Sequence, residues 1–155
     1  TELGFQIGAV DITGKSYAQL KVLLKDKNII YVQGGNTFYL LKEAKASGFD
    51  RLVKELLENG VIYIGVSAGS YIACPTIEMA TWKRGKEQHG LTDFSAMNLV
   101  PFLLSVHYNR DKYRDALLEG ITKTKYPVRI LTDDQVLLIR DDAVTLLGSG
   151  EEVKL

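Results

Sequence analysis

A serine stands between small residues where an apolar stretch meets a short turn, in Gly65-Val66-Ser67-Ala68-Gly69. The pattern fits G-x-S-x-G, in which a sharp strand-to-helix turn leaves room only for small neighbours beside the serine. Such a turn raises the hydroxyl into solvent near the free N–H groups of the following helix, which can stabilise an oxyanion. We therefore predict Ser67 as a nucleophile; the alternative is a tight turn whose serine only caps the helix.

A second loop of small residues, Gly34-Gly35-Asn36-Thr37, also lies between a predicted strand and a predicted helix. Glycines at such a place let a ligand or another backbone approach closely. If the two strands are neighbours, this loop lies beside Ser67, and one of its N–H groups becomes a second oxyanion donor. The loop lacks the Walker pattern and the G-x-G-x-x-G spacing, which argues against a nucleotide site. A close-packed turn without a ligand is the alternative.

A serine nucleophile needs a base within hydrogen-bond reach, and histidine suits this role best. Of the two histidines, His89 lies in the polar segment GKEQHG, whereas His107 follows the apolar stretch NLVPFLLSV and precedes a predicted helix. That position is a strand terminus at the same edge as Ser67, so we predict His107 as the general base rather than a structural histidine. Ser67 and His107 are only 40 positions apart, which is too short a separation for an α/β-hydrolase.

Strands and helices alternate along the chain. Short runs at 28–33 and 61–66, rich in β-branched and aromatic residues, are typical of buried parallel strands. Amphipathic patterns predict a helix that starts at about 37 and has Gly48 past its end, and another that starts at 49 and has Gly60 as its C-terminal cap. This alternation favours a parallel α/β sheet with helices on both faces. Further helices are predicted at 16–26 and 109–121, and further strands at 1–12, 128–132, 135–140, 143–148 and 151–155, with a hairpin turn at Asp141-Asp142.

The composition excludes several classes of protein. A length of 155 residues suits one globular domain. The 19 basic and 19 acidic side chains give no cationic excess, which argues against a nucleic-acid partner. No apolar run approaches the ~20 residues of a membrane helix, and no signal peptide is visible, so no membrane partner is expected. The one cysteine, Cys74, permits no internal disulfide, which suits a reducing cytoplasm.

Three ordered motifs carry a resemblance to a known family: GGNTFYLLKEAKASG, YIGVSAGSYIACPTIE and VHYNRD. Together they resemble the peptidase E family of α-aspartyl dipeptidases, with cyanophycinases as more distant relatives. The resemblance implies a three-layer sandwich around a mainly parallel sheet, similar to class I glutamine amidotransferases, to which this sequence adds a C-terminal β-hairpin. It also implies a cytoplasmic serine hydrolase that needs no cofactor or metal and removes an N-terminal aspartyl residue from small peptides.

The resemblance assigns roles residue by residue. Ser67 matches the family's nucleophile and His107 its general base, while the N–H groups of Gly35 and Ala68 match its oxyanion hole. Arg110 stands where the family holds the aspartyl side chain of the substrate, and a guanidinium fork suits a carboxylate. The residues implied in substrate binding are Gly34, Asn36 and Arg110.

The triad acid is the first departure from the family pattern. Family members usually carry an acidic residue between serine and histidine, where this sequence has Trp82 followed by two basic residues. We predict Glu87 as the third member of the triad, with Glu78 as the alternative, and Asp93 as a turn or cap residue. A Ser-His dyad can also work without the acid, because the acid mainly orients and stabilises the imidazolium.

The start of the chain is the second departure. Family chains usually carry further strands and helices before the segment TELGFQIGAV, so residues 1–155 are expected to form a single, N-terminally short peptidase E-like domain. A sheet edge that the family covers would then be exposed, and an exposed edge invites pairing with another copy. A homodimer through this edge is the expected assembly.

The sequence thus predicts a serine dipeptidase whose partner is a small peptide with an N-terminal Asp. Ser67 attacks the scissile carbonyl to form an acyl-enzyme, and His107 passes the serine proton to the leaving amine. The alternative is a catalytically impaired module of the same fold that binds an acidic ligand or assembles without turnover.

Overall fold

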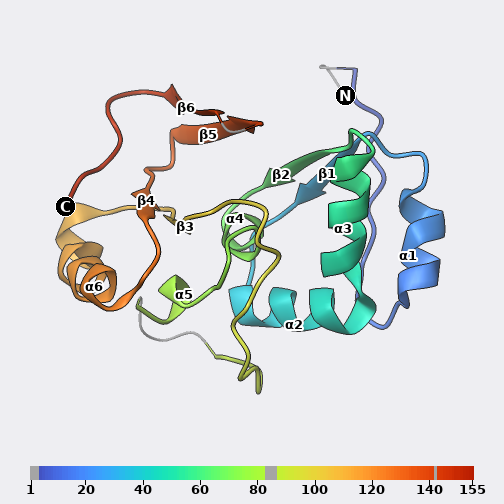
Figure 1. Ribbon diagram of the computed structural model, residues 1–155, viewed down its shortest axis with the longest axis horizontal. Helices are drawn as coiled ribbons and strands as arrows, with labels where there is room; N and C mark the ends of the chain where they lie inside the picture. The colour runs from blue at the N-terminus through green and yellow to red at the C-terminus, as the bar shows by residue number, and fades with distance from the viewer. Residues whose placement is uncertain (1–3, 83–86, 142) are drawn as a thin grey trace.

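Two parallel strand pairs and an antiparallel hairpin, with six helices, make up the described part of the chain (Figure 1). The computed structural model describes residues 4–82, 87–141 and 143–155. In chain order the elements are α1 (Tyr17–Leu24), β1 (Ile29–Val32), α2 (Thr37–Ser47), α3 (Phe49–Glu58), β2 (Ile62–Gly65), α4 (Ala68–Ile72), α5 (Met79–Trp82), β3 (Leu103–Ser105), α6 (Arg110–Lys123), β4 (Val128–Ile130), β5 (Gln135–Arg140) and β6 (Ala143–Gly148).

Capping side chains and a left-handed glycine set the ends of the helices in the first half of the chain. Ser16 and Gln19 form a reciprocal capping box at the start of α1. The Asn36 side chain accepts hydrogen bonds from the first N–H groups of α2. Gly48, at φ 74°, ends α2 in the left-handed conformation and starts α3 at once. The predicted helices are therefore confirmed, with their ends shifted by a few residues.

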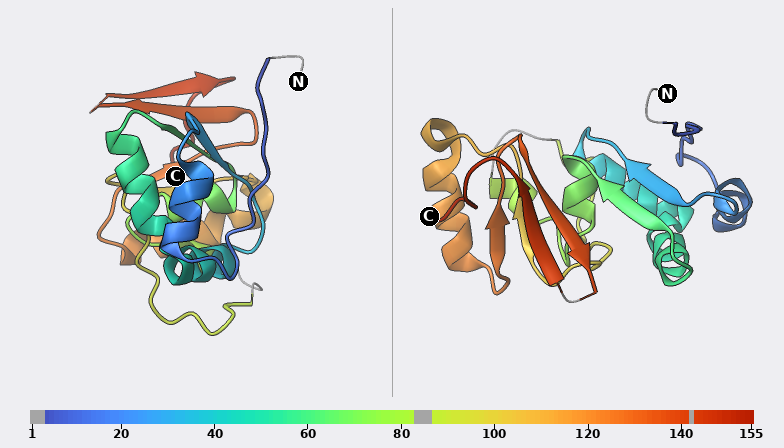
Figure 2. Two further views of the ribbon diagram at one scale, coloured as in Figure 1. Left: turned by 90° about the vertical axis from the view of Figure 1, so that its right-hand side faces the viewer. Right: turned by 90° about the horizontal axis from the view of Figure 1, so that it is seen from above.

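The parallel pair β1–β2 is covered on one face only. Its strands pair from Ile29 opposite Ile62 to Val32 opposite Gly65. Seen from above, the pair lies in front of α2 (Figure 2, right). Ile30 and Val32 are buried. On the other face Tyr31 and Ile62 are 56% and 57% exposed.

The second half of the chain lies on the other side of α4. The pair β3–β4 is parallel, from Leu103 opposite Val128 to Ser105 opposite Ile130, and β5–β6 forms the predicted antiparallel hairpin. Helix α4 contacts β1, β2 and β3 and lies between the two parallel pairs (Figure 1). Cys74, just beyond α4, accepts a hydrogen bond from the Leu104 N–H of β3 at 3.3 Å, which ties the two halves together.

Of three expectations about the sheet, one is confirmed only in part and two are wrong. The strands form three two-stranded sheets, so the mixed α/β class is confirmed but the three-layer sandwich and the amidotransferase-like class are not. The strand predicted at 1–12 is wrong for residues 4–12, which are extended but pair with no described strand; residues 1–3 lie outside the described ranges. The strand predicted at 151–155 is also wrong, because these residues form no strand ladder; the Glu151 carbonyl oxygen accepts from the Gln135 side chain and the Glu152 carboxylate from the Arg129 side chain.

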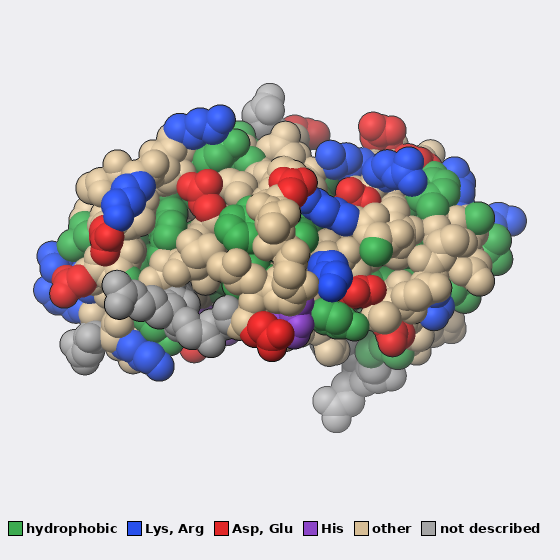
Figure 3. Space-filling model, turned by 90° about the horizontal axis from the view of Figure 1, so that it is seen from below, with side chains coloured by type: hydrophobic (Ala, Val, Ile, Leu, Met, Phe, Trp, Pro, Cys, Tyr) green, Lys and Arg blue, Asp and Glu red, His purple; other side chains and the backbone are tan. Residues whose placement is uncertain are grey.

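The surface seen from below mixes both signs of charge. Lys and Arg side chains alternate there with Asp and Glu, and neither sign forms a continuous area on this face (Figure 3). Within the described ranges, every helix is too short or too polar to cross a bilayer.

Candidate active site

Ser67 lies on a strained turn between β2 and α4. Its backbone adopts φ 55° and ψ −110°, a conformation that L-residues rarely take. A Cβ added to Gly69 would stand 2.2 Å from the Val32 carbonyl oxygen, and one added to Gly65 would stand 2.6 Å from the Gly69 oxygen. Only glycine fits at either position, so the two glycines of the G-x-S-x-G pattern are required by the close approach of α4 to the strands.

Two side chains hold the carbonyl groups of this turn. The Tyr63 hydroxyl donates to the Gly69 oxygen at 2.7 Å, and the Ser70 hydroxyl donates to the Gly65 oxygen at 2.8 Å. Burial raises the pKa of Tyr63 well above its ordinary value, so its hydroxyl remains a donor. Hydrogen bonds at both ends of the turn oppose relaxation of the strained Ser67 backbone.

The Gly34-Gly35 loop lies beside Ser67. A Cβ built on Gly34 would be 3.1 Å from the Ser67 Cβ and 3.4 Å from its Oγ. Neither the Gly35 nor the Ala68 N–H donates to an acceptor in the described part of the chain, so both are available to a ligand. The Asn36 side chain is occupied: its Oδ1 accepts from the Phe38 and Tyr39 N–H groups, and its Nδ2 donates to the Glu87 carbonyl oxygen at 2.9 Å.

His107 is paired with a carboxylate from the neighbouring strand. The β3–β4 pairing extends past the strand ends through bonds from Leu131 N to the Ser105 oxygen, 2.9 Å, and from Tyr108 N to the Leu131 oxygen, 3.0 Å. This register places His107 beside Asp133, and the imidazole Nδ1 shares a hydrogen bond with the Asp133 Oδ1. His107 has φ 58°, an uncommon value that is frequent at functional sites.

The acids predicted from the sequence lie elsewhere. The Glu87 carboxylate is exposed and stands 3.8 Å from the Nδ1 of His89, not beside His107. The Glu78 side chain forms no ion pair with another described residue. The Asp93 Oδ1 accepts a hydrogen bond from the Ser95 backbone N–H at 3.0 Å, and hydrogen bonds from Lys45 and Ser95 hold the pKa of Asp93 well below the usual range. In the described residues, Asp133 is thus the carboxylate that contacts the candidate base.

A signal for Asp133 was present in the sequence. Asp133-Asp134 directly follows the predicted strand at 128–132, just as His107 follows the stretch that contains β3. The carboxyl ends of paired parallel strands meet at one edge of a sheet. The pairing of β3 with β4, which the sequence did not provide, is what brings the two side chains together.

Arg110 is the first residue of α6 and is exposed to solvent. Its guanidinium forms no hydrogen bond or ion pair with any side chain in the described ranges. A positive charge at the start of a helix is mildly unfavourable. This guanidinium, three positions after His107 in the sequence, is therefore available to an anionic ligand.

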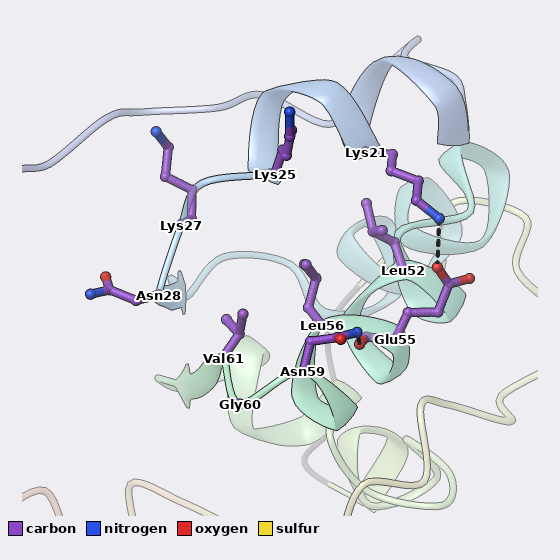
Figure 4. Close-up of a pocket in the computed structure, with 10 residues that line it drawn as sticks. All are labelled: Lys21, Lys25, Lys27, Asn28, Leu52, Glu55, Leu56, Asn59, Gly60 and Val61. Atoms are coloured by element: carbon purple, nitrogen blue, oxygen red, sulfur yellow. Dashed lines mark hydrogen bonds and ion pairs between the residues drawn. The ribbon is translucent and has the colours of Figure 1, made fainter.

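A cavity of about 420 Å³ lies at the opposite end of β1 and β2, between α1 and α3. Its floor is apolar, with Leu52, Leu56 and Val61, while Lys25 and Lys27 point away from that floor (Figure 4). Lys21 donates to Glu55 at 3.1 Å (Figure 4). The polar groups do not converge on the cavity, so it has none of the features of a catalytic site.

The side chains give little support to catalysis by a cysteine thiol or by a bound metal ion. Burial raises the pKa of the Cys74 thiol to about 12, which makes it an inert core residue. Among the residues that the structure describes, no three His, Cys, Asp or Glu side chains are grouped to hold a metal ion.

The strained serine, the glycine loop and the histidine–carboxylate pair are typical of hydrolases that activate a serine. The family model described as Peptidase family S51 matches residues 1–147. The chain therefore belongs to peptidase family S51, and family membership supports a peptidase.

Several known proteins are similar to the chain. An uncharacterized peptidase of Listeria innocua is 34% identical over 155 residues, covering 97% of this chain and 74% of that protein. Peptidase E of Escherichia coli is 32% identical over 143 residues, 92% of this chain but 57% of that protein, so the chain spans less than two thirds of it. The structure of a protein from Listeria monocytogenes, proposed to be a peptidase E, superposes with a TM-score of 0.83, at 31% identity over 96% of this chain and 73% of that one.

Proposed function

We propose that the chain is a serine dipeptidase that hydrolyses short peptides with an N-terminal Asp. The observation that carries the proposal is the His107–Asp133 pair, which follows β3 and β4 as Ser67 follows β2. Peptidase E relatives make a peptidase the expected activity for such a group. The serine mechanism and the Asp preference are the parts that need an experiment.

The side chains divide the reaction between them. Ser67 Oγ attacks the scissile carbonyl while the Nε2 of His107 takes its proton, and the same imidazole then gives this proton to the leaving amine. Asp133 keeps the Nδ1 of His107 protonated and stabilises the imidazolium that forms. The free N–H groups of Gly35 and Ala68 hold the oxyanion, and water later hydrolyses the acyl-enzyme.

The substrate preference rests on Arg110. Its unpaired guanidinium lies at the start of the helix that follows His107, and a bidentate bond to the aspartyl carboxylate would fix the substrate's N-terminal residue. A lysine at position 110 would keep the positive charge but could not form the bidentate hydrogen bonds of a guanidinium. An Arg110→Lys variant should therefore raise the KM for Asp-X peptides more than it lowers kcat.

The test is hydrolysis of an Asp-X dipeptide series by the chain, with Ser67→Ala in parallel and Ala-X peptides as the substrate control. Serine-dependent turnover confined to N-terminal Asp is the expected result. A fluorophosphonate probe should label the wild type and not the Ser67→Ala variant, whether or not the right peptide is offered. Absence of labelling on a folded chain would refute the serine mechanism.

A second candidate function, an assembly module without turnover, is favoured by the open face of β1–β2. Tyr31, Ile62 and Ile64 form an exposed apolar surface there, and apolar surfaces of this kind often mark interfaces. We infer that a second copy covers it. Sedimentation of the wild type and of Ile62→Lys, at matched concentration, distinguishes a dimer that the lysine dissociates from a monomer that it leaves unchanged.

A further inference from the structure

Asp133 stands on a short exposed turn, residues 133–134, in the connection from β4 to β5. A carboxylate on such a turn would ordinarily be free to swing away from a histidine that is itself exposed. Fixing both groups costs conformational entropy, so something outside the turn has to hold it. The C-terminal segment, residues 148–152, lies against this turn.

Gln135 is the centre of the contact. It is buried, and its Oε1 accepts a hydrogen bond from the Thr132 N–H at 3.1 Å, across the acid-bearing turn. Its Nε2 donates to the carbonyl oxygens of Ser149, at 3.1 Å, and Glu151, at 3.0 Å. One buried amide thus links both sides of the turn to the C-terminal segment, and all of its bonds are internal to this network.

Asp134 makes a second link between the same two segments. Its carboxylate accepts hydrogen bonds from the Ser149 and Thr132 hydroxyls, which hold its pKa below the ordinary value. Gly148, at φ 109°, lies so close that a Cβ there would stand 2.0 Å from the Asp134 carbonyl oxygen. The carboxylate next to Asp133 is therefore engaged away from His107, which leaves Asp133 to pair with the imidazole.

We propose that Gln135 and residues 148–152 form a clasp that positions Asp133 against His107. Gln135 is a positioning residue, because it acts through Asp133 and does not touch the reacting atoms. The role in catalysis rests on the proposed serine mechanism, whereas the role in holding the His107–Asp133 pair does not. Loss of the clasp should leave substrate binding intact and misplace the acid, so kcat should fall and KM should not.

The test compares Gln135→Leu, which keeps the size but removes the three hydrogen bonds, with Ser149→Ala, which removes only the hydroxyl link. Thr145→Val, on the outer face of the same hairpin, is the control. We expect kcat for Asp-X hydrolysis to fall about tenfold in Gln135→Leu and about threefold in Ser149→Ala, with KM within about twofold. Because Gln135 is buried, folding is checked by thermal unfolding, and the exposed Ser149 carries the test if Gln135→Leu does not fold.

An activity-independent readout separates this proposal from the proposed function. Imidazole ¹⁵N shifts, at a pH where histidine is neutral, report the tautomer that Asp133 selects, and His89 is the internal reference. The clasp variants should shift His107 toward the spectrum of Asp133→Asn, and Thr145→Val should not. Unchanged His107 shifts in folded Gln135→Leu and Ser149→Ala would overturn the clasp, even if the wild type is an active peptidase. If the clasp variants change the His107 shifts but the wild type has no peptidase activity, the clasp is supported and only the proposed function is refuted.

Discussion

The nucleophile and the acid–base pair are built in opposite ways. The Ser67 turn is shaped mainly by residues from Tyr63 to Ser70 and by β1 with the loop that follows it, through close backbone approach at glycines and through the Tyr63 and Ser70 hydroxyls. The His107–Asp133 pair depends on side chains and on segments far apart in the chain, from β3 to the C-terminal segment. Backbone sterics allow the serine turn only one conformation, whereas two side chains on exposed turns can adopt many.

This difference predicts whether a substitution in each part of the candidate site lowers stability or activity. Substitutions at the serine turn should act mainly on stability, because α4 is packed directly on Val32 through Gly69. Substitutions at the acid should act mainly on catalysis, because His107 and Asp133 are exposed and carry little of the core.

Asp133→Asn should lower kcat/KM about 10²–10⁴-fold, since asparagine cannot stabilise the imidazolium and can select the wrong tautomer. Glu87→Gln, the matched change at the acid that the sequence suggested, should alter it less than about twofold. Steady-state kinetics on an Asp-X peptide measures both. A larger loss of kcat/KM in Glu87→Gln than in Asp133→Asn would mean that Glu87, and not Asp133, is the acid of the triad.

Gly69→Ala should destabilise the fold by about 3 kcal/mol or more, because the added methyl would overlap the Val32 carbonyl oxygen. Gly8→Ala is the control: a Cβ there has no atom within 4 Å, and the change should stay within about 0.5 kcal/mol. Urea unfolding gives both values. Equal stability of the two variants would mean that α4 can move away from β1 freely.

Cys74, at the boundary between the two halves, predicts a pH dependence. Its pKa is about 12 in the folded protein, against an ordinary value of 9.0 for an exposed thiol, so between these values only the unfolded state releases the proton. Fewer protons bound in the unfolded state mean that stability falls as pH rises above 9, by at most about 1.4 kcal/mol per pH unit. In Cys74→Ala this part of the slope should vanish in unfolding measured from pH 8 to 10.5. Parallel curves for the two proteins would contradict the buried thiol.

Tyr63→Phe should cost about 1 kcal/mol, the net contribution of its hydrogen bond to the Gly69 oxygen. Tyr31→Phe, on the exposed face of the neighbouring strand, should be neutral. If the Ser67 turn also depends on this bond, fluorophosphonate labelling should slow in Tyr63→Phe alone. Equal labelling rates would confine Tyr63 to a structural role.

The local parts of the fold could be read from the sequence because they depend on neighbours in the chain. The Asn36 cap and the Gly48 helix junction are each determined within a few residues, and the G-x-S-x-G spacing marks the Ser67 turn even though it is Val32 of the neighbouring strand that requires glycine at 69. The segment at 4–12 shows the limit: its residues suit a strand, but a strand needs a partner edge, and none lies beside it in the described structure.

By itself the sequence determined the strand–helix alternation, the serine turn and the choice of His107 over His89 as candidate base. Only the tertiary structure decided which carboxylate meets that histidine, because Asp133 reaches it through the pairing of β3 with β4. It also decided that one face of β1–β2 remains open. Periodicity and turn chemistry act between near neighbours, whereas strand pairing joins residues whose separation along the chain carries no local signal.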